Sequence, residues 1–170
     1  MKNLLILLLI IFACNSCQET QEDKFEKDGV SLTSPNGWKI TDKENLSNQG
    51  YYLCIEKDGL NSSGLITLIW VNGEFELNEW INIHKEEMKN NIIYKNSNLV
   101  FGDIHENKFN NLNTSSLKFT FSLFGVKHQG VIHAFYKKEK TFYLLIQEAI
   151  EDQYKNRRGL ELIEQSFKIE

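Results

Sequence analysis

Proline and cysteine are scarce in this sequence, and that scarcity excludes several classes of protein. The chain of 170 residues has one proline and three cysteines, while 12% of it is aromatic. So little proline, with that aromatic content, favours a well-packed globular domain over a disordered chain. The cysteines include no C-x-x-C pair, which excludes the usual redox motif, and their spacing matches no zinc site.

The motifs of the common enzyme classes are also missing. The sequence contains no G-x-S-x-G nucleophile elbow, no P-loop and no dinucleotide-binding glycine fingerprint. Gly59 and Gly64 have the wrong spacing for the elbow and predict a turn. Adjacent carboxylates occur at 86–87 and 151–152, but neighbours on a helix do not face one site, so we interpret both pairs as solvated surface. We therefore predict a non-enzymatic protein without a cofactor.

The four histidines form no recognisable metal motif. His105 begins a zincin-like pattern, but Phe109 stands where the second histidine is required. His128 and His133 are five residues apart on an expected strand, so we predict that their side chains point to opposite faces of the sheet. We predict that the protein binds no metal.

The first residues carry a more specific pattern. Lys2 is followed by the apolar run Leu4–Phe12 and by Ala13. The run is much shorter than the about 20 residues of a membrane span, but it fits the apolar core of about 7–15 residues in a secretory signal. We predict a lipoprotein signal peptide at residues 1–13, with a buried N-terminal helix or a simple secretory signal as the alternatives.

The end of this leader resembles a bacterial lipobox. Ile11-Phe12-Ala13-Cys14 has the aliphatic, variable, small and cysteine residues in that order. The resemblance implies that Cys14 is acylated with fatty acids such as palmitate and becomes the first residue after cleavage. Cys17 is the alternative acceptor, because Ser16 precedes it, although Cys14 then occupies the position of the aliphatic residue.

The resemblance to a lipobox also implies a location and an anchor. We expect the protein in a bacterial cell envelope, held by lipid, and in the outer membrane on its periplasmic or surface face. Neither cysteine is followed by aspartate, which signals retention in the inner membrane. Residues 14–28 are polar apart from Phe25, so we predict that they form a flexible tether between the acylated cysteine and the domain.

Residues 29–170 predict one α+β domain. Strands are expected at 30–32, 38–40, 51–57, 65–71, 99–105, 116–124, 126–138 and 141–149, with polar connections at 41–50 and 106–113. An amphipathic helix is expected at Asn78–Asn91, where Asn78 can cap the first turn, and His84 can meet Glu87 one turn later. A second helix follows Glu151, and Gly159 within it costs about 1 kcal/mol relative to alanine.

Two phrases in this domain carry a family resemblance. They are Gly29-Val30-Ser31-Leu32 with Pro35-Asn36-Gly37-Trp38, and Ile163-Glu164-Gln165-Ser166-Phe167. With the order of elements, they resemble the PsbP-like superfamily, which includes Mog1 and DcrB-type lipoproteins. The resemblance implies a central antiparallel sheet flanked by two main helices. It also implies a binding or assembly-support protein with no catalytic residues.

The net charge and the aromatic residues indicate which kinds of binding partner to expect. A net charge of −4 argues against nucleic acid as a partner. The aromatic residues either fill the core or line a groove between sheet and helix. We therefore expect the domain to bind a partner protein at the envelope, with no ligand-binding residue identified. The alternatives are a binder of a small apolar or lipid-like ligand in an aromatic groove, and an enzyme with a scattered site.

Overall fold

The structure is a computed structural model that describes residues 22–47, 49–59 and 62–170. The predicted signal peptide and both candidate acceptors, Cys14 and Cys17, lie outside these residues. The elements are β1 (Asp23–Lys27), β2 (Val30–Ser34), β3 (Trp38–Asn45), β4 (Gly50–Lys57), β5 (Leu65–Asn72), α2 (Leu77–Asn90), β6 (Val100–Phe101), β7 (His105–Phe109), β8 (Leu112–Leu123), β9 (Val126–Lys137), β10 (Lys140–Ala149), the 3-10 turn η1 (Ile150–Asp152), α3 (Gln153–Ser166) and β11 (Lys168–Ile169).

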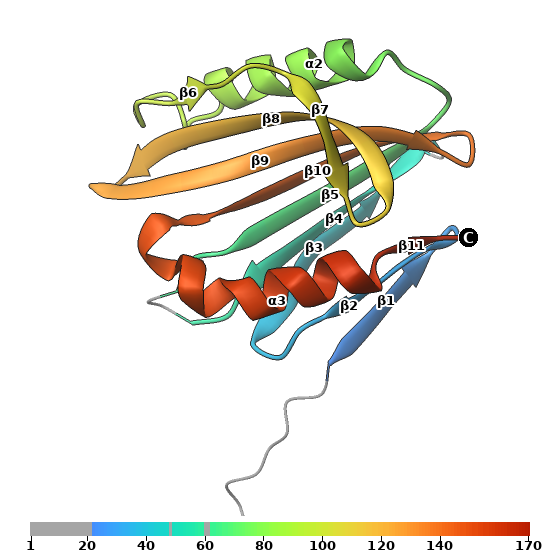
Figure 1. The fold of residues 1–170 in the computed structure, drawn as a ribbon, viewed down its shortest axis with the longest axis horizontal. Helices are drawn as coiled ribbons and strands as arrows, with labels where there is room; N and C mark the ends of the chain where they lie inside the picture. The colour runs from blue at the N-terminus through green and yellow to red at the C-terminus, as the bar shows by residue number, and fades with distance from the viewer. Residues whose placement is uncertain (1–21, 48, 60–61) are drawn as a thin grey trace, which may run out of the picture.

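Antiparallel strands dominate the molecule. A large sheet has the order β3-β4-β5-β10-β9-β8-β6, with β7 also paired to β8, and a small sheet has the order β1-β2-β11. Helix α2 covers one face of the large sheet, while α3 lies against the other face beside the small sheet (Figure 1). The predicted antiparallel sheet with two flanking helices is therefore present, but the domain contains more sheet than we expected.

The strands of the large sheet are apolar on both faces because each face is covered. Successive residues of a strand point to opposite faces, so β8, β9 and β10 contribute to two separate layers. The α2 layer contains Ile81, Leu117, Phe119, Phe121 and Ile132, all buried. The α3 layer contains Trp70, Phe135, Phe142, Ile163 and Phe167, also buried.

Three polar stretches are strands where we expected irregular chain. β1 lies inside the predicted tether 14–28, β3 extends into the predicted loop 41–50, and β7 occupies the predicted connection 106–113. One buried aromatic residue anchors β1 and another anchors β7. Phe25 packs against Tyr51 and Trp70, and Phe109 is 2% exposed. The folded domain therefore begins before residue 28.

Helix α2 differs slightly from the prediction at its first turn. Glu76 caps α2, because its carboxylate accepts a hydrogen bond from the backbone N–H of Glu79 at 2.6 Å. The expected cap, Asn78, lies inside the helix. In the described part of the chain, neither helix has the length and apolar character needed to cross a membrane.

Gly159 has a packing role in α3. A Cβ atom at this position would lie 2.6 Å from Nε1 of Trp38, whose indole ring rests against the helix. Such a distance is shorter than real Cβ contacts allow. The glycine therefore lets α3 approach the start of β3, and its low helix propensity is the cost of that approach.

Candidate functional site

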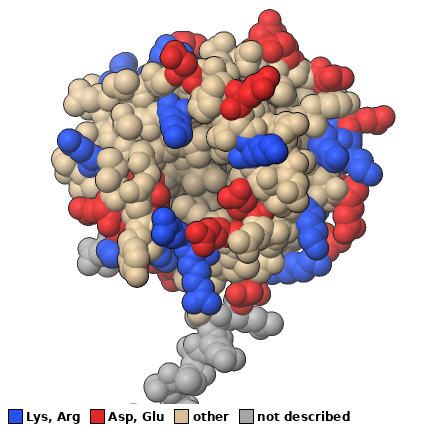
Figure 2. Space-filling model, viewed as in Figure 1, with Lys and Arg blue, Asp and Glu red and all other residues tan. Residues whose placement is uncertain are grey.

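A groove between β7 and α3 is one of several concave features of the domain. It has a volume of about 580 Å³ and is lined by residues 107–109, 118–120, 129–131, 133, 146–148, 153, 160 and 164. We call it the β7–α3 groove. Figure 2 shows the molecule hollowed in the middle of this face, with basic side chains at the upper rim. A hollow of about 870 Å³ along α2 is lined only by residues of that helix and Asn91, so it has no opposing wall.

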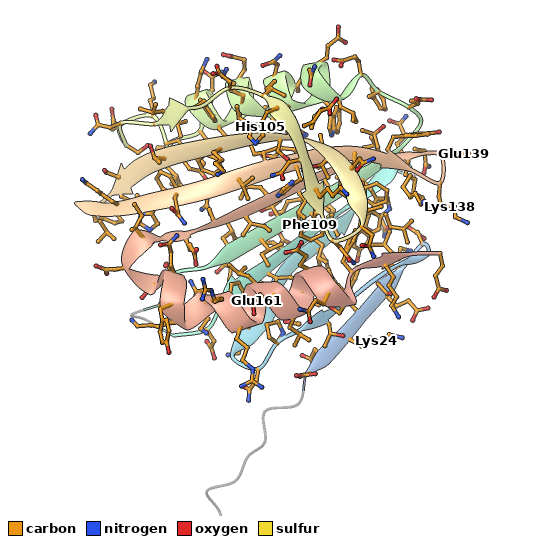
Figure 3. All side chains as sticks on the ribbon, viewed as in Figure 1. Lys24, His105, Phe109, Lys138, Glu139 and Glu161 are labelled. Carbon is orange, nitrogen blue, oxygen red and sulfur yellow. The ribbon has the colours of Figure 1, made fainter. Side chains whose placement is uncertain are left out.

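The hairpin of β7 and β8 forms one wall of the groove because its turn is fastened to α3. The backbone N–H of Asn110 donates to Oε1 of Glu164 at 2.8 Å. Phe109 packs edge-on against Phe167, with ring centroids 5.6 Å apart. Figure 3 places Phe109 at the α3 end of β7 and His105 at the far end. The hairpin thus bends over the sheet and closes one end of the groove.

The floor of the groove is apolar with a single cation. Val131 on β9 lies opposite Lys118 on β8 and opposite Ile146 on β10. The three side chains therefore share one face of the sheet. No described carboxylate forms an ion pair with Lys118. Leu160 of α3 faces this floor across the groove and is half-buried.

A buried polar cluster lies at the β7 side of the groove. Nδ1 of His133 is 2.7 Å from Oγ of Ser116 and 3.1 Å from Oγ1 of Thr114, and the two hydroxyls are 2.9 Å apart. Burial, and then the nearby His105, lower the pKa of His133 from 6.5 to about 4. The imidazole is therefore neutral near pH 7.

This serine–histidine contact does not support catalysis. A nucleophile must be reachable by its substrate, but Ser116 is 0% exposed. A general base works best with a pKa near the operating pH, and the pKa of about 4 at His133 is far below it. The cluster instead satisfies polar groups that the sheet and hairpin bury.

A second polar cluster fixes the other end of α3. Ser63 donates to Oδ2 of Asp152 through its backbone N–H at 2.9 Å and its hydroxyl at 2.8 Å. Nδ2 of Asn156 donates to the carbonyl of Ser63 at 2.6 Å and to Oε2 of Glu148 at 3.0 Å. Hydrogen bonds from Lys155 and then Ser63 lower the pKa of Asp152. The arrangement has serine directly on a carboxylate with no histidine between them, so it is a structural clamp.

The structure also places the histidines that the sequence singled out. His84 and Glu87 meet as predicted, with Nδ1 and Oε2 2.8 Å apart, beneath α2. His128 stacks on Phe121 of the α2 layer, while His133 packs on Phe109 on the other side, which confirms the predicted opposite faces. Among the described residues, no three His, Cys, Asp or Glu side chains converge as a metal site requires.

The aromatic residues and Cys54 belong mostly to the core. Trp38, Tyr51, Trp70, Phe121, Phe135, Phe142 and Tyr143 are buried. Only Phe109 and Phe119 among the described aromatic residues line the β7–α3 groove. Cys54 is buried with a free thiol, as a small apolar residue would be. The expectation of an aromatic groove therefore does not describe this site.

Sequence reasoning missed the residues that build both polar clusters: Ser63, Thr114, Ser116, Glu148, Asp152 and Asn156. One signal was available for Ser116. Gly125 predicts a tight turn, and an antiparallel hairpin pairs residues equally distant from its turn. That rule places Ser116 opposite His133, as the structure does.

Comparison with known proteins shows what this fold is similar to. No family model and no curated protein matches the sequence. The solved structures that match include two that are similar over most of the chain. LpqN of Mycobacterium tuberculosis, a protein involved in cell envelope biogenesis, has a TM-score of 0.52 and 15% identity, covering 88% of this chain and 90% of its own. PsbP (CyanoP) from Synechocystis sp. PCC 6803 has a TM-score of 0.58 and 11% identity, covering 92% of this chain and 97% of its own. The chain therefore has a PsbP-like fold.

Proposed function

We propose that this protein is a non-enzymatic lipoprotein of the bacterial cell envelope that binds a partner protein in the β7–α3 groove. The anchor in this proposal is acylated Cys14, with Cys17 as the alternative, in the outer membrane. The lipobox-like Ile11–Cys14 supports the anchor, and the likeness to LpqN supports the envelope.

One observation carries the binding proposal. The β7–α3 groove is open to solvent, and it combines an apolar floor with polar walls. Its buried hydroxyl and imidazole groups are already hydrogen-bonded to one another. A concave surface with hydrogen-bonded polar groups and no serine or cysteine among its described lining residues is suited to holding a ligand without changing it.

The test of this proposal is photo-crosslinking in cells with the full chain. A photo-reactive amino acid replaces Asn107, which lines the groove, and in a matched strain it replaces Lys138, which lies in the β9–β10 turn. Figure 3 shows Lys138 at the edge of the molecule. We expect one protein, identified by mass spectrometry, to be captured from position 107 and not from position 138. Equal capture at both positions, or none, contradicts the proposal.

A small apolar or lipid-like ligand is the second candidate for the groove. The half-buried side chains of Val131, Ile146 and Leu160 favour it, because they offer apolar surface to an acyl chain. Native mass spectrometry of the full chain from its own membrane tests this candidate. A lipid that stays bound to the unaltered chain, but not to Val131→Asp, supports it. Capture of lipid alone, without a protein, rejects the partner proposal.

A further inference from the structure

We propose that the β7–α3 groove binds an extended polypeptide segment with one acidic residue for Lys118, which adds to the edge of β7 as a further β-strand. This inference rests on the proposed function, because it names the kind of partner that the groove accepts. It depends on the free edge of β7, on the position of that edge in the groove and on the charge of the groove floor.

The register of the hairpin shows which backbone groups of β7 are free. Phe109 pairs with Leu112 across the two-residue turn, and Asn107 pairs with Thr114. In such a ladder the closing pair is hydrogen-bonded, and hydrogen-bonded pairs recur at every second residue. The intervening residues, Glu106 and Lys108, therefore direct their N–H and C=O groups away from β8. Along the described chain, no other strand pairs with β7 on that side.

The hydrogen bonds of the neighbouring strand β8 confirm that alternate residues of the hairpin direct their backbone groups to opposite sides. The carbonyl of Lys118 on β8 accepts a hydrogen bond from the N–H of Gly102 at 2.8 Å. Even-numbered residues of β8 thus direct their backbone groups toward the β6–β7 side, as the pairing of Thr114 with Asn107 requires. The free groups of β7 lie one strand further out, at the edge of the sheet.

This edge faces the groove. Asn107, Lys108 and Phe109 all line it. Side chains alternate along a strand, so Lys108 projects on the face opposite Phe109, and Lys108 is exposed. We therefore assign its contact with the groove to the main chain. An unpaired strand edge that lines a groove is the arrangement used for strand addition.

The other edge of the large sheet lacks these properties. At β3 the register shifts between Ile40 and Asp42, which breaks the regular ladder that a new strand needs. At β7 the register runs unbroken from His105 to Phe109. Helix α3 stands opposite β7 across the groove, so the edge is reached by one extended segment rather than by another folded sheet (Figure 1).

The charges of the groove define the segment. Glu164 and Glu148 also line it, and they accept hydrogen bonds from Asn110 and Asn156 respectively. The groove as a whole therefore carries both signs of charge, and an acidic residue of the segment is favoured only beside Lys118. Lys118 has no carboxylate partner among the described residues and lies in one row with Val131 and Ile146. A strand presents every second side chain to the same face. The segment that fits places an apolar and an acidic residue two positions apart toward this floor.

The experiment uses the full chain and a phage library of random linear peptides. Selected peptides are synthesised with a fluorophore, and their dissociation constants are measured by polarisation for the unaltered chain, Lys108→Pro and Lys108→Ala. Proline removes the free N–H, and edge positions tolerate it because that group takes no part in the ladder. We expect peptides in which Asp or Glu lies two positions from an apolar residue. Binding should weaken about tenfold or more for Lys108→Pro, and by no more than about twofold for Lys108→Ala.

Amide hydrogen exchange gives a second readout in the unaltered chain, which does not depend on the folding of a variant. Peptide binding should slow exchange at Glu106 and Lys108, and leave Asn107, already bonded to β8, unchanged. Failure to select any peptide, equal weakening by Pro and Ala, or slowing confined to other elements overturns strand addition. If position 107 captures a cellular partner while the peptide results fail, partner binding stands and this mode of binding is wrong. If position 107 captures nothing, the proposed function itself fails.

Discussion

The two faces of the large sheet are covered by helices of equal length but in different ways. α2 and α3 each span 14 residues. α2 lies along its face and seals an apolar layer over β8 and β9. α3 shares its face with the small sheet and leaves the β7–α3 groove open beside it (Figure 1). The same strands therefore support a closed layer on one side and a binding surface on the other.

The two faces also differ in how hydrogen bonds hold their helices. Nε1 of Trp80 and Nε2 of His84 beneath α2 are buried with no hydrogen-bond partner among the described residues, as is Oδ1 of Asn156 on α3. At the ends of α3, Asp152 and Glu164 hold neighbouring segments through hydrogen bonds. Packing thus holds the α2 face together, and directional bonds position α3 while leaving space for a ligand.

Removing apolar volume should therefore cost much more in the sealed α2 layer than on the groove-facing side of α3. Ile81 of α2 is 0% exposed, and Ile81→Ala should lower the free energy of unfolding by about 3–4 kcal/mol through lost burial and a cavity. Leu160→Ala on α3, at the solvated groove, should cost about 1 kcal/mol or less. Urea unfolding followed by circular dichroism measures both, and equal losses would contradict the contrast between the faces.

Acid should weaken the α3 face more than the α2 face. Burial lowers the pKa of His133 from 6.5 to about 4, so the unfolded chain binds a proton between these values that the folded chain does not. Stability is therefore lost as the pH falls from about 6.5 to about 4, by about 2–3 kcal/mol. His133→Gln should flatten this part of the pH profile of the free energy of unfolding.

His84 provides the comparison on the other face. Burial lowers its pKa as well, but the Glu87 carboxylate opposes that effect. Its loss of stability therefore has the same sign and should be smaller. His84→Gln should change the slope less than His133→Gln does between pH 6.5 and 4. If His84→Gln changed the slope more than His133→Gln, the α2 face rather than the α3 face would be the more sensitive to acid.

Removing one side-chain amide should destabilise the protein more when the amide lies on α3 than when it lies on α2. Asn156→Ala leaves the carbonyl of Ser63 and the buried carboxylate of Glu148 without their donor, which should cost about 2 kcal/mol. Asn90→Ala on α2 removes an exposed bond to the carbonyl of Glu86 and should cost about 0.5 kcal/mol or less. Thermal unfolding of the two variants measures the difference, and matching shifts in Tm would argue against a clamp at the start of α3.

Long strands and α2 could be predicted because their apolar residues repeat with a clear period. β1 and β7 could not, since each of these short strands contains one buried aromatic residue, Phe25 or Phe109, among polar residues. A single apolar residue defines no period. The position of β7 also depends on the bond between Asn110 and Glu164, which are far apart in the sequence.

The site was therefore less predictable than the fold. The floor residues Lys118, Val131 and Ile146 belong to strands that the alternation predicts, and hairpin register alone places the first two opposite each other. The wall formed by β7 and the clamp of Ser63 on Asp152 depend on contacts between distant segments. The order of elements does not determine those contacts.

Gly159→Ala should give a small change, because two effects of opposite sign meet at one residue. Alanine favours the helix by about 1 kcal/mol over glycine, but its Cβ would lie 2.6 Å from Nε1 of Trp38. Overpacking of this kind costs about 1–3 kcal/mol, so we expect a net loss of about 1 kcal/mol in urea unfolding. Trp38→Phe removes the ring that meets the Cβ. In that background Gly159→Ala should therefore cost less than it does with Trp38 intact, although Cγ of Pro35 still lies 3.2 Å from the Cβ position. Such a result would show that contact with Trp38 is the main reason for glycine at this position. A stabilising Gly159→Ala with Trp38 intact would show that the helix has room to move away from β3, and the groove would then have a movable wall.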